Sequence, residues 1–385
     1  MKITPKKIKS YLTVKFYNFG TRIRVFFAWV KSGFVKKKER KYYLMNAKRV
    51  AEQRRDIKKL KEDFKTYLKT VKKIDGKSEV TRLTRDFISC FKKYGIDAEE
   101  YFSVRYFSLT PKDREKIVSR WRQFHVVCSL NPVEYRNLID DKKIFTRKFK
   151  DYINRVSLDM KTCTFDDFDK LFDSNEKIII KPTNLWSGQG VYAINTKKNT
   201  AKKLFDDLKG KDLLAEEFIK QTGILHDVCP TCVNTVRIAT LNDQGEITIF
   251  FAWVRAGRFG SVVDNLHAGG ILWPVDHING VISDVGFDND GNEYSVHPDS
   301  GINMVGLKLP YWEEACETCK RIAREVPELS YISWDVVISD DKISIIEGNC
   351  NGGFWRPYSS DYDMWSYIKD FMDKKLGDKR PMRYF

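Results

Sequence analysis

The spacing of apolar residues changes character near residue 176. Before that point apolar residues recur at helical intervals, three and four residues apart. The pattern predicts helices over 41–75, over 80–95, and from Pro111 through about 126, where proline suits the first helical turn. The apolar positions of the longest helix are Leu44, Val50, Ile57, Leu60, Phe64 and Leu68.

From residue 176 onward the pattern is typical of strands that alternate with a few helices. Short runs rich in β-branched and aromatic residues predict strands at 177–182, 190–195, 212–219, 232–241, 246–257, 261–275, 331–339 and 342–349. Helical spacing returns near 164–173, 199–208, 310–325 and 363–376. We expect an α+β fold with long antiparallel stretches, in which a mainly helical region, 1–130, precedes a domain over 131–385.

Composition and charge refine this division. The 385 residues are 42% hydrophobic and 14% aromatic, which is typical of a folded protein with a core. No apolar run is long enough to span a bilayer, and Lys15, Arg22 and Arg24 interrupt the first apolar stretch, so we expect a cytoplasmic protein without a signal peptide. Residues 1–80 hold 25 Lys/Arg and 7 Asp/Glu, a net charge of +18, whereas the rest of the chain is slightly acidic at −2.

Residues 1–40 mix these cations with aromatic residues, and two interpretations fit. The segment binds the interface of an anionic membrane, on the inner face of the cytoplasmic membrane, or it packs its aromatic side on the body of the protein. Nucleic-acid binding shares the charge signature but lacks a reader motif. The aromatic residues are Tyr11, Phe16, Tyr17, Phe19, Phe26, Phe27, Trp29 and Phe34.

Eight cysteines include two pairs with CxxC spacing. Cys316 and Cys319 lie in a helical segment, where this spacing only places them on one face. Cys229 and Cys232 follow a loop and open a strand. Two such pairs are able to complete a zinc site, but free thiols in a reducing compartment are the favoured interpretation.

The first candidate site combines a lysine with a glycine loop. Lys181 ends an apolar strand, and Ser187, Gly188, Gln189 and Gly190 follow. A point charge and closely approaching backbone N–H groups suit a triphosphate, although Gly-x-Gly also occurs in ordinary turns. A second strand ends in acidic residues that are able to hold adenine and ribose, or are simply solvated; its end comprises Glu216, Glu217, Phe218 and Ile219.

The third segment is an acidic hairpin. Asp335 precedes an apolar strand and a turn, and Glu347 and Asn349 follow on the next strand with a period of two. Residues on adjacent strands face each other, so these three side chains make an oxygen-rich site that suits Mg²⁺. Unpaired carboxylates inside apolar strands are otherwise costly to bury.

In this order, the three segments resemble the ATP-grasp superfamily, which includes D-alanine–D-alanine ligase. Residues 234–241, 254–271 and 333–353 are similar, more narrowly, to the sugar-transfer-associated ATP-grasp family, whose members are associated with bacterial capsule and surface-polysaccharide genes. The resemblance covers roughly residues 130–360. It implies two α+β subdomains whose antiparallel sheets clasp ATP.

The resemblance also implies roles for individual residues. Lys181, the glycine loop and Lys142 would bind the phosphates, and residues 216–219 would form the adenine hinge. Asp335, Glu347 and Asn349 would hold Mg²⁺, as two ions. The γ-phosphate would face Arg237, Arg255 and Arg258, and the substrate would face Asp264, Asn265, His267, Gly269 and Gly270.

Two departures from the family pattern matter. Leu185 and Trp186 stand where many relatives have further glycines. Ser333 stands where D-alanine–D-alanine ligases have an arginine, so Arg237 or Arg255 would supply that charge.

The function that this set implies is an ATP-dependent carboxylate–amine ligase acting through an acyl-phosphate, on a bacterial surface polysaccharide or its precursor. A kinase that phosphorylates a hydroxyl or phosphate would use the same ATP site. A membrane scaffold with a degenerate nucleotide site is the third alternative. Neither the carboxylate nor the amine substrate, sugar-linked or not, is identified by the residues.

Overall fold

The structure is a computed structural model that describes residues 56–183, 190–340, 342–353 and 362–377. The chain divides into two compact units, and Tyr101 and Phe102 lie on either side of the boundary. The described part of the first unit is a pair of helices, α4 (Ile57–Thr70) and α5 (Lys77–Tyr94). The predicted helix over 41–75 is therefore seen as α4, and its residues 41–55 lie outside the described residues.

Aromatic packing holds α4 against α5. The rings of Phe64 and Phe87 stack with their centroids 4.0 Å apart, and Tyr101 meets both edge-on. The Tyr101 hydroxyl donates to Asp86 at 2.7 Å, so the polar end of this buried ring is satisfied.

The second unit, Phe102–Lys375, begins with short helices. The single helix predicted from Pro111 to about 126 is wrong in one respect. It is two helices, α7 (Pro111–Lys116) and α8 (Arg120–Leu130), because the Ser119 hydroxyl caps the second by accepting from the Arg122 N–H. The other helical segments before the first sheet are α6 (Ala98–Ser103), η1 (Tyr106–Ser108), α9 (Asn137–Asp140), α10 (Lys142–Lys148) and α11 (Lys150–Ile153).

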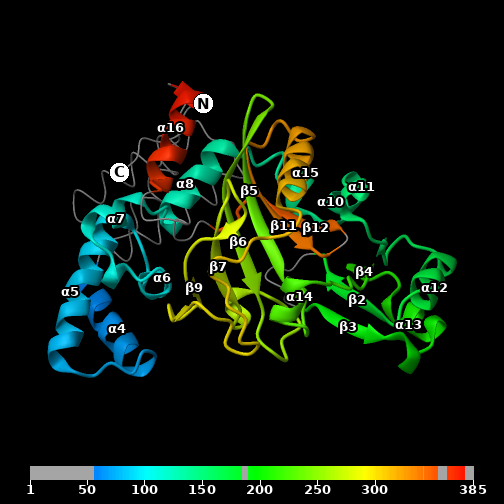
Figure 1. Cartoon of the computed structure of the whole chain (residues 1–385), viewed down its shortest axis with the longest axis horizontal. Coiled ribbons are helices and arrows are strands. Elements are labelled where there is room, and N and C mark those ends of the chain that lie inside the picture. Colours follow the sequence, from blue (N-terminus) through cyan, green and yellow to red (C-terminus); the bar gives the residue numbers. More distant parts are fainter. Residues whose placement is uncertain (1–55, 184–189, 341, 354–361, 378–385) are drawn as a thin grey trace, which may run out of the picture. The chain divides into compact units, whose positions relative to one another are not determined.

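A four-stranded antiparallel sheet follows, in the order β1-β4-β2-β3. Figure 1 shows helices α12 and α13 beside it, and their Phe168 and Phe205 pack on Ile178 and Ile180. Because side chains alternate along a strand, the other face carries Lys181 and its neighbours. The strands are β1 (Ser157–Asp159), β2 (Lys177–Pro182), β3 (Tyr192–Asn195) and β4 (Leu213–Glu217), and the helices are α12 (Phe165–Asp173), η2 (Thr196–Lys198) and α13 (Ala201–Leu208).

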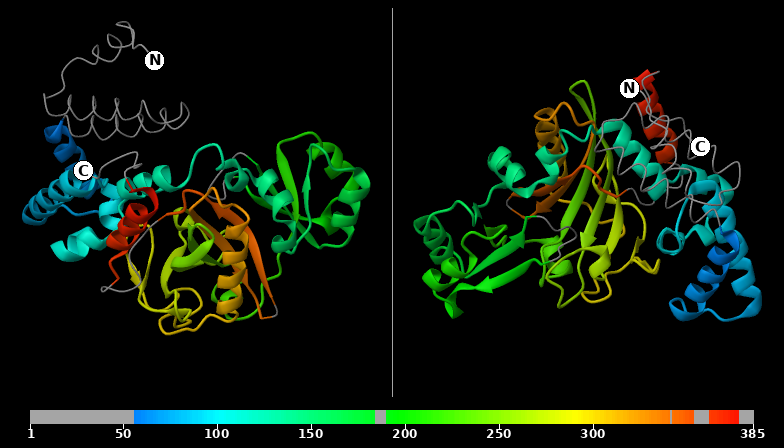
Figure 2. Two further views of the ribbon diagram at one scale, coloured as in Figure 1. Left: turned by 90° about the horizontal axis from the view of Figure 1, so that it is seen from above. Right: turned by 180° about the vertical axis from the view of Figure 1, so that it is seen from behind.

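The larger sheet is also antiparallel, in the order β10-β9-β7-β6-β5-β11-β12, with β8 paired to β7. Helix α15 packs on one face of it (Figure 2). The strands are β5 (Thr235–Asp243), β6 (Glu246–Ala256), β7 (Ile271–Asp276), β8 (Val281–Ile282), β9 (Gly286–Phe287), β10 (Glu293–Tyr294), β11 (Tyr331–Ile338) and β12 (Ile343–Asn349); the helices are α14 (Ile224–Val228), η3 (Leu266–Ala268), α15 (Trp312–Arg324) and α16 (Met364–Leu376).

The strand predicted over 261–275 is only half a strand. Its first part is a loop, and β7 begins at Ile271. Gly269 has φ of 88°, and a Cβ at Gly270 would lie 2.4 Å from the Asp264 carbonyl oxygen. The two glycines therefore allow a tight turn that side chains would block.

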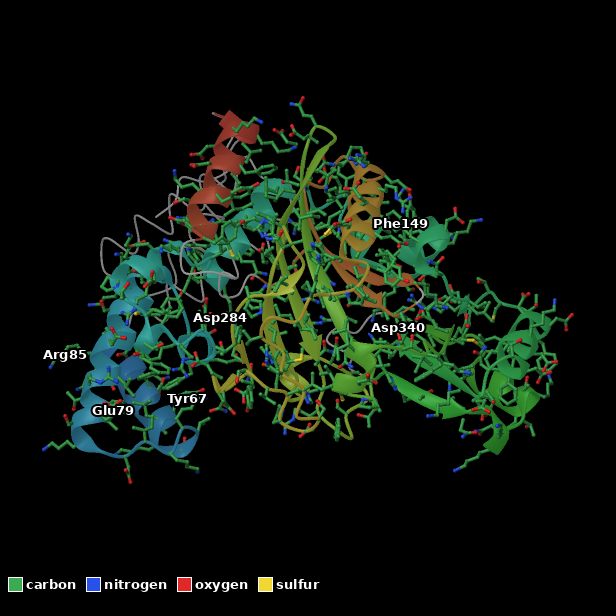
Figure 3. The ribbon with its side chains drawn as sticks, viewed as in Figure 1. Tyr67, Glu79, Arg85, Phe149, Asp284 and Asp340 are labelled. Carbon is green, nitrogen blue, oxygen red and sulfur yellow. The ribbon has the colours of Figure 1, made fainter. Side chains whose placement is uncertain are left out.

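The two faces of the large sheet differ in chemistry. The face under α15 is apolar and includes Ile238, Val254 and Trp334; Phe149, labelled in Figure 3, meets Trp334 edge-on at 6.3 Å. The register of β11 and β12 shifts after the pairing of Asp335 with Glu347. This β-bulge lets Ile345 enter the apolar core while Glu347, two residues later, faces the opposite side.

The outer edge of β12 is covered by the segment Ile153–Arg155. The Ser344 hydroxyl donates to the Ile153 carbonyl at 2.5 Å, and the Asn154 amide donates to the Ile343 carbonyl at 3.2 Å. Arg155 continues the contact to the carbonyls of Ile345 and Ile346. The chain passes from this edge directly into β1 of the smaller sheet.

The α+β prediction is confirmed, with antiparallel sheets preceded by helices. Among the described residues, no helix combines the length and apolar character needed to cross a membrane.

One buried histidine makes a testable contribution to stability. Burial lowers the pKa of His125, on α8, to about 4, whereas the unfolded chain has a value near 6.5. Between these two pH values the unfolded state binds the proton first. We therefore expect the free energy of unfolding to fall by up to about 1.4 kcal/mol per unit as pH decreases from about 6.5 toward 4. Urea titrations should show a shallower decline for His125→Gln, and identical slopes would contradict this assignment.

Candidate active site

A buried carboxylate lies between two arginines on the polar face of the large sheet. Strand register places Asp335 on β11 beside Arg237 on β5. Arg255 on β6 pairs with Thr235, which lies two residues before Arg237 on β5. Arg237 donates from Nε and Nη2 to the two oxygens of Asp335 at 2.8 and 2.9 Å, and Arg255 Nη2 lies 3.0 Å from Oδ2. Burial raises the pKa of Asp335, but the two guanidiniums outweigh it and hold that pKa below its usual range.

Glu347 and Asn349 face the same side from β12. Gly348 between them faces the core, where a Cβ would lie 2.9 Å from Ile139 and 3.0 Å from the Trp334 ring. Burial and then the charge of Asp335 raise the pKa of Glu347, while Lys181 and Lys142 oppose the rise. The side chain of Glu347 is thus within electrostatic reach of Lys181 on the small sheet and of Lys142 on helix α10.

This donor set fits a hard divalent cation. Arg237 donates to both oxygens of Asp335, and the Glu347 carboxyl group also lies within hydrogen-bond distance of this carboxylate. The carboxyl groups of Asp335 and Glu347 and the side-chain carbonyl of Asn349 supply hard oxygen donors, which are those that Mg²⁺ prefers.

A second charged cluster lies on the helix-free face of the small sheet. Lys181 Nζ lies 2.6 Å from Glu216 Oε2, and Arg155 Nε donates to the same oxygen at 3.2 Å. The Ser157 hydroxyl donates to Oε1 at 2.8 Å. Burial would raise the pKa of Glu216, but Arg155 and Lys181 lower it to about 2, and burial lowers the pKa of Lys181 against the charge of Glu216.

The remaining nucleotide-site candidates are placed as follows. Lys142, the first residue of α10, donates to the Pro182 carbonyl at 3.0 Å, which brings it beside the end of the Lys181 strand. Glu217 points away from Glu216 and accepts from the Val156 N–H. Phe218 has Lys177 over its ring, and Ile219 is half-buried. Gly190 has φ of 70°, whereas Ser187, Gly188 and Gln189, with Leu185 and Trp186, lie outside the described residues.

The predicted arginine group is only partly brought together. Arg258 does not reach Asp335 and instead forms a two-pronged ion pair with Asp299 at 2.7 Å, with 39% of its side chain exposed. Arg237 and Arg255 both contact Asp335, two residues after Ser333.

The substrate-side candidates also separate. Asp264 is buried and accepts from the backbone N–H of Thr235 at 3.0 Å, and its Oδ2 lies 3.3 Å from Arg255 Nε. Asp264 therefore positions Arg255 through its Nε atom, while the Nη2 atom of Arg255 contacts Asp335. The Asn265 carbonyl accepts from Ala268 and Gly270, and His267 and Gly269 are exposed.

The cysteine pairs are free thiols. Cys229 and Cys232 are 3.6 Å apart at sulfur, and the hydrogen bond between them lowers the pKa of Cys229 and raises that of Cys232. Cys316 and Cys319 are buried on α15, apart from that pair. Among the described residues no group of three or more His, Cys, Asp or Glu side chains is arranged to hold a metal.

Two members of the site were missed from the sequence. Arg155 joins the small-sheet cluster, and Thr235 accepts from Arg255 Nε at 2.9 Å. Arg155 gave no signal, because it lies between two short elements without periodicity. Thr235 stands two residues before Arg237, and this period of two on a polar strand face would have identified it.

The chain combines helices with two antiparallel sheets. One sheet carries a buried lysine and the other an acidic strand pair, as in proteins of the ATP-grasp class. Residues 122–357 match the family described as sugar-transfer associated ATP-grasp, and the chain belongs to this family. The family predicted from the motifs over roughly 130–360 is thereby confirmed. No curated protein matches the chain significantly.

Solved structures with a similar arrangement are ATP-grasp ligases. The ligase PsnB, complexed with a phosphomimetic variant of minimal precursor, Mg and ADP, aligns at 13% identity and a TM-score of 0.40, covering 64% of this chain and 62% of that one. D-alanine–D-alanine ligase from Coxiella burnetii aligns at 12% identity and a TM-score of 0.37, covering 63% and 58%. The corresponding Bacillus anthracis ligase complexed with ATP gives 14% and 0.35, covering 64% and 68%. The chain therefore spans less than two thirds of the first two.

The Asp335 cluster leads to a stability prediction. Asp335→Asn leaves the buried Arg237 guanidinium without its ion-pair partner and removes one of the two carboxylates beside Arg255, and we expect a loss of roughly 3 kcal/mol in the free energy of unfolding. The matched control is Asp299→Asn, whose partner Arg258 is largely solvated, with an expected loss of about 1 kcal/mol or less. Chemical denaturation of both variants measures the difference, and equal losses would contradict the assignment of Asp335 as the buried anchor.

Proposed function

We propose that the protein is an ATP-dependent ligase that joins a carboxylate to an amine through an acyl-phosphate, and that it modifies a bacterial surface polysaccharide or its precursor. The observation that supports it most is the buried set on β11 and β12, with Arg237 and Arg255 on Asp335 and the lysines within reach of Glu347. Family membership adds the ATP-grasp class and the association with sugar transfer.

Each group has a task in this reaction. Lys181 and Lys142 bind the α- and β-phosphates, and β4 with residues 217–219 lies against the adenine and ribose. Glu347, Asn349 and Asp335 would hold Mg²⁺, as two ions, and the bound metal would offset negative charge on the phosphates. The guanidiniums of Arg237 and Arg255 are rigidly held and face the γ-phosphoryl group during its transfer to the substrate carboxylate.

The proposed roles of the remaining residues follow from their contacts. Arg258 pairs with Asp299 outside the arginine cluster, and the loop of Asn265, His267, Gly269 and Gly270 is proposed to face the substrate. Asp264 holds Arg255 through Thr235 and does not itself meet substrate.

The test is product analysis with Mg²⁺-ATP and panels of amino acids, sugar acids and amino sugars. We expect ADP, phosphate and an amide whose mass equals the two substrates minus water; hydroxylamine in place of the amine should trap the acyl-phosphate as a hydroxamate. Glu347→Gln should lower turnover on the order of 100-fold, because charge stabilisation at the phosphates is lost. Glu328→Gln, an exposed carboxylate elsewhere, should not.

Three results would reject this function. A phosphorylated substrate that accumulates without amide would identify the kinase alternative. ADP release that does not depend on any carboxylate or amine would remove the ligase assignment. The absence of nucleotide turnover, with biological function unchanged in Glu347→Gln, would favour the scaffold.

We also propose that residues 1–40 recruit the enzyme reversibly to the inner face of the cytoplasmic membrane. The net charge of +18 on residues 1–80 and the interspersed aromatic residues support it. The full chain should co-sediment with vesicles containing anionic lipid, and less so at high salt, because surface charge is screened. Co-sedimentation that persists unchanged after deletion of residues 1–40 would disprove this role.

A further inference from the structure

The guanidinium of Arg155 connects the two charged clusters. Only 3% of its side chain is exposed, although arginine is seldom buried without a specific partner. Nη1 and Nη2 donate to the carbonyls of Ile345 and Ile346 at 2.8 and 3.1 Å, and Nε donates to Glu216 at 3.2 Å. One planar group thus contacts β12 of the large sheet and β4 of the small sheet.

The contact with β12 falls on the bulge. Carbonyls of consecutive residues in a regular strand point to opposite edges, so one side chain cannot bind both. The register shift opposite Asp335 and Val336 lets Ile345 and Ile346 offer both carbonyls to Arg155. Because this bulge also sets the direction of Glu347, Arg155 stabilises the orientation of that carboxyl group.

The contact of Arg155 with β4 connects it, through Glu216, to Lys181, the lysine proposed to bind phosphate. Glu216 Oε2 accepts from Arg155 Nε and lies 2.6 Å from Lys181 Nζ. A displacement of Arg155 would therefore release the carboxylate that holds Lys181 in place. The path from Lys181 to the Glu347 strand consists of two hydrogen-bonded side chains, Glu216 and Arg155.

We propose that Arg155 is a positioning residue that couples metal binding to nucleotide binding. It sets the distance between Lys181 and Glu347, so that a metal on β12 meets phosphates held by the small sheet. This inference rests on the proposed function, because it needs ATP and Mg²⁺ at these two clusters.

A conservative substitution separates this role from simple charge neutralisation. Lysine in place of arginine would still neutralise Glu216, but its single ammonium cannot donate in one plane to two carbonyls and a carboxylate. Arg155→Lys should therefore keep the small-sheet cluster charged while it loses the link to the bulge. Arg321→Lys is the matched control, since Arg321 contacts Thr318 within helix α15.

The experiment measures ADP affinity with and without Mg²⁺ for the full chain and each variant, by titration calorimetry. The readout is the factor by which Mg²⁺ tightens ADP binding. Partners that orient metal ligands usually affect metal affinity by about 10 to 100-fold. In Arg155→Lys we expect this factor to be at least about tenfold smaller than in the wild type. The affinity for ADP without Mg²⁺ should change by less than about threefold. Arg321→Lys should match the wild type in both measurements.

An unchanged Mg²⁺ factor in Arg155→Lys would overturn the inference. If circular dichroism shows that this variant is unfolded, Glu216→Gln interrupts the same link from the other side, and it must then show the reduced factor. A smaller Mg²⁺ factor in Arg155→Lys and Glu216→Gln, with an unchanged factor in Arg321→Lys, supports the coupling. A wild-type chain that binds no nucleotide would instead overturn the proposed function, and the inference with it.

Discussion

The cost of burying charge is the constraint on which this site depends. Asp335 is 1% exposed inside an apolar strand, and it is tolerated there because Arg237 and Arg255 neutralise and hydrogen-bond it. Neither guanidinium is in turn stable without the carboxylate. The three residues form a unit that no single substitution leaves intact, and their strands must pair in one register.

The small sheet repeats this solution with different residues. Glu216 is held by Lys181 and Arg155, as Asp335 is held by two arginines. In the small-sheet cluster one carboxylate binds two cations, which leaves an excess of one positive charge there, whereas Asp264 also offsets Arg255 in the large-sheet cluster. Such an excess in a low-dielectric setting attracts anions, and the cations are already oriented when an anion arrives. Burial and the charge of Asp335 raise the pKa of Glu347, and a cation bound beside this carboxyl group would lower it.

The strands and the site residues on them could be predicted from the sequence where polar and apolar residues alternate regularly. Lys181 and Glu347 stand out because polar residues interrupt strongly apolar runs, and strand pairing then follows from the alternation of faces. Two features were beyond such reasoning. The bulge at Ile346 changes the facing of its neighbours without any compositional signal, and Arg155 acts from a connection that has no period. Arg258 was grouped with Arg237 and Arg255 from the sequence, whereas its ion-pair partner in the structure, Asp299, comes from a loop 41 residues further along the chain.

The order of strands in the large sheet has a consequence for how the protein folds. β5 and β6 form a hairpin across a tight turn, so Arg237 and Arg255 come together through local contacts. Asp335 is 98 residues away from Arg237 in the chain. Hairpins close within microseconds, whereas pairings over such separations form much more slowly. Local contacts therefore bring Arg237 and Arg255 together, whereas the carboxylate that they share reaches them only through the long-range pairing of β11 with β5.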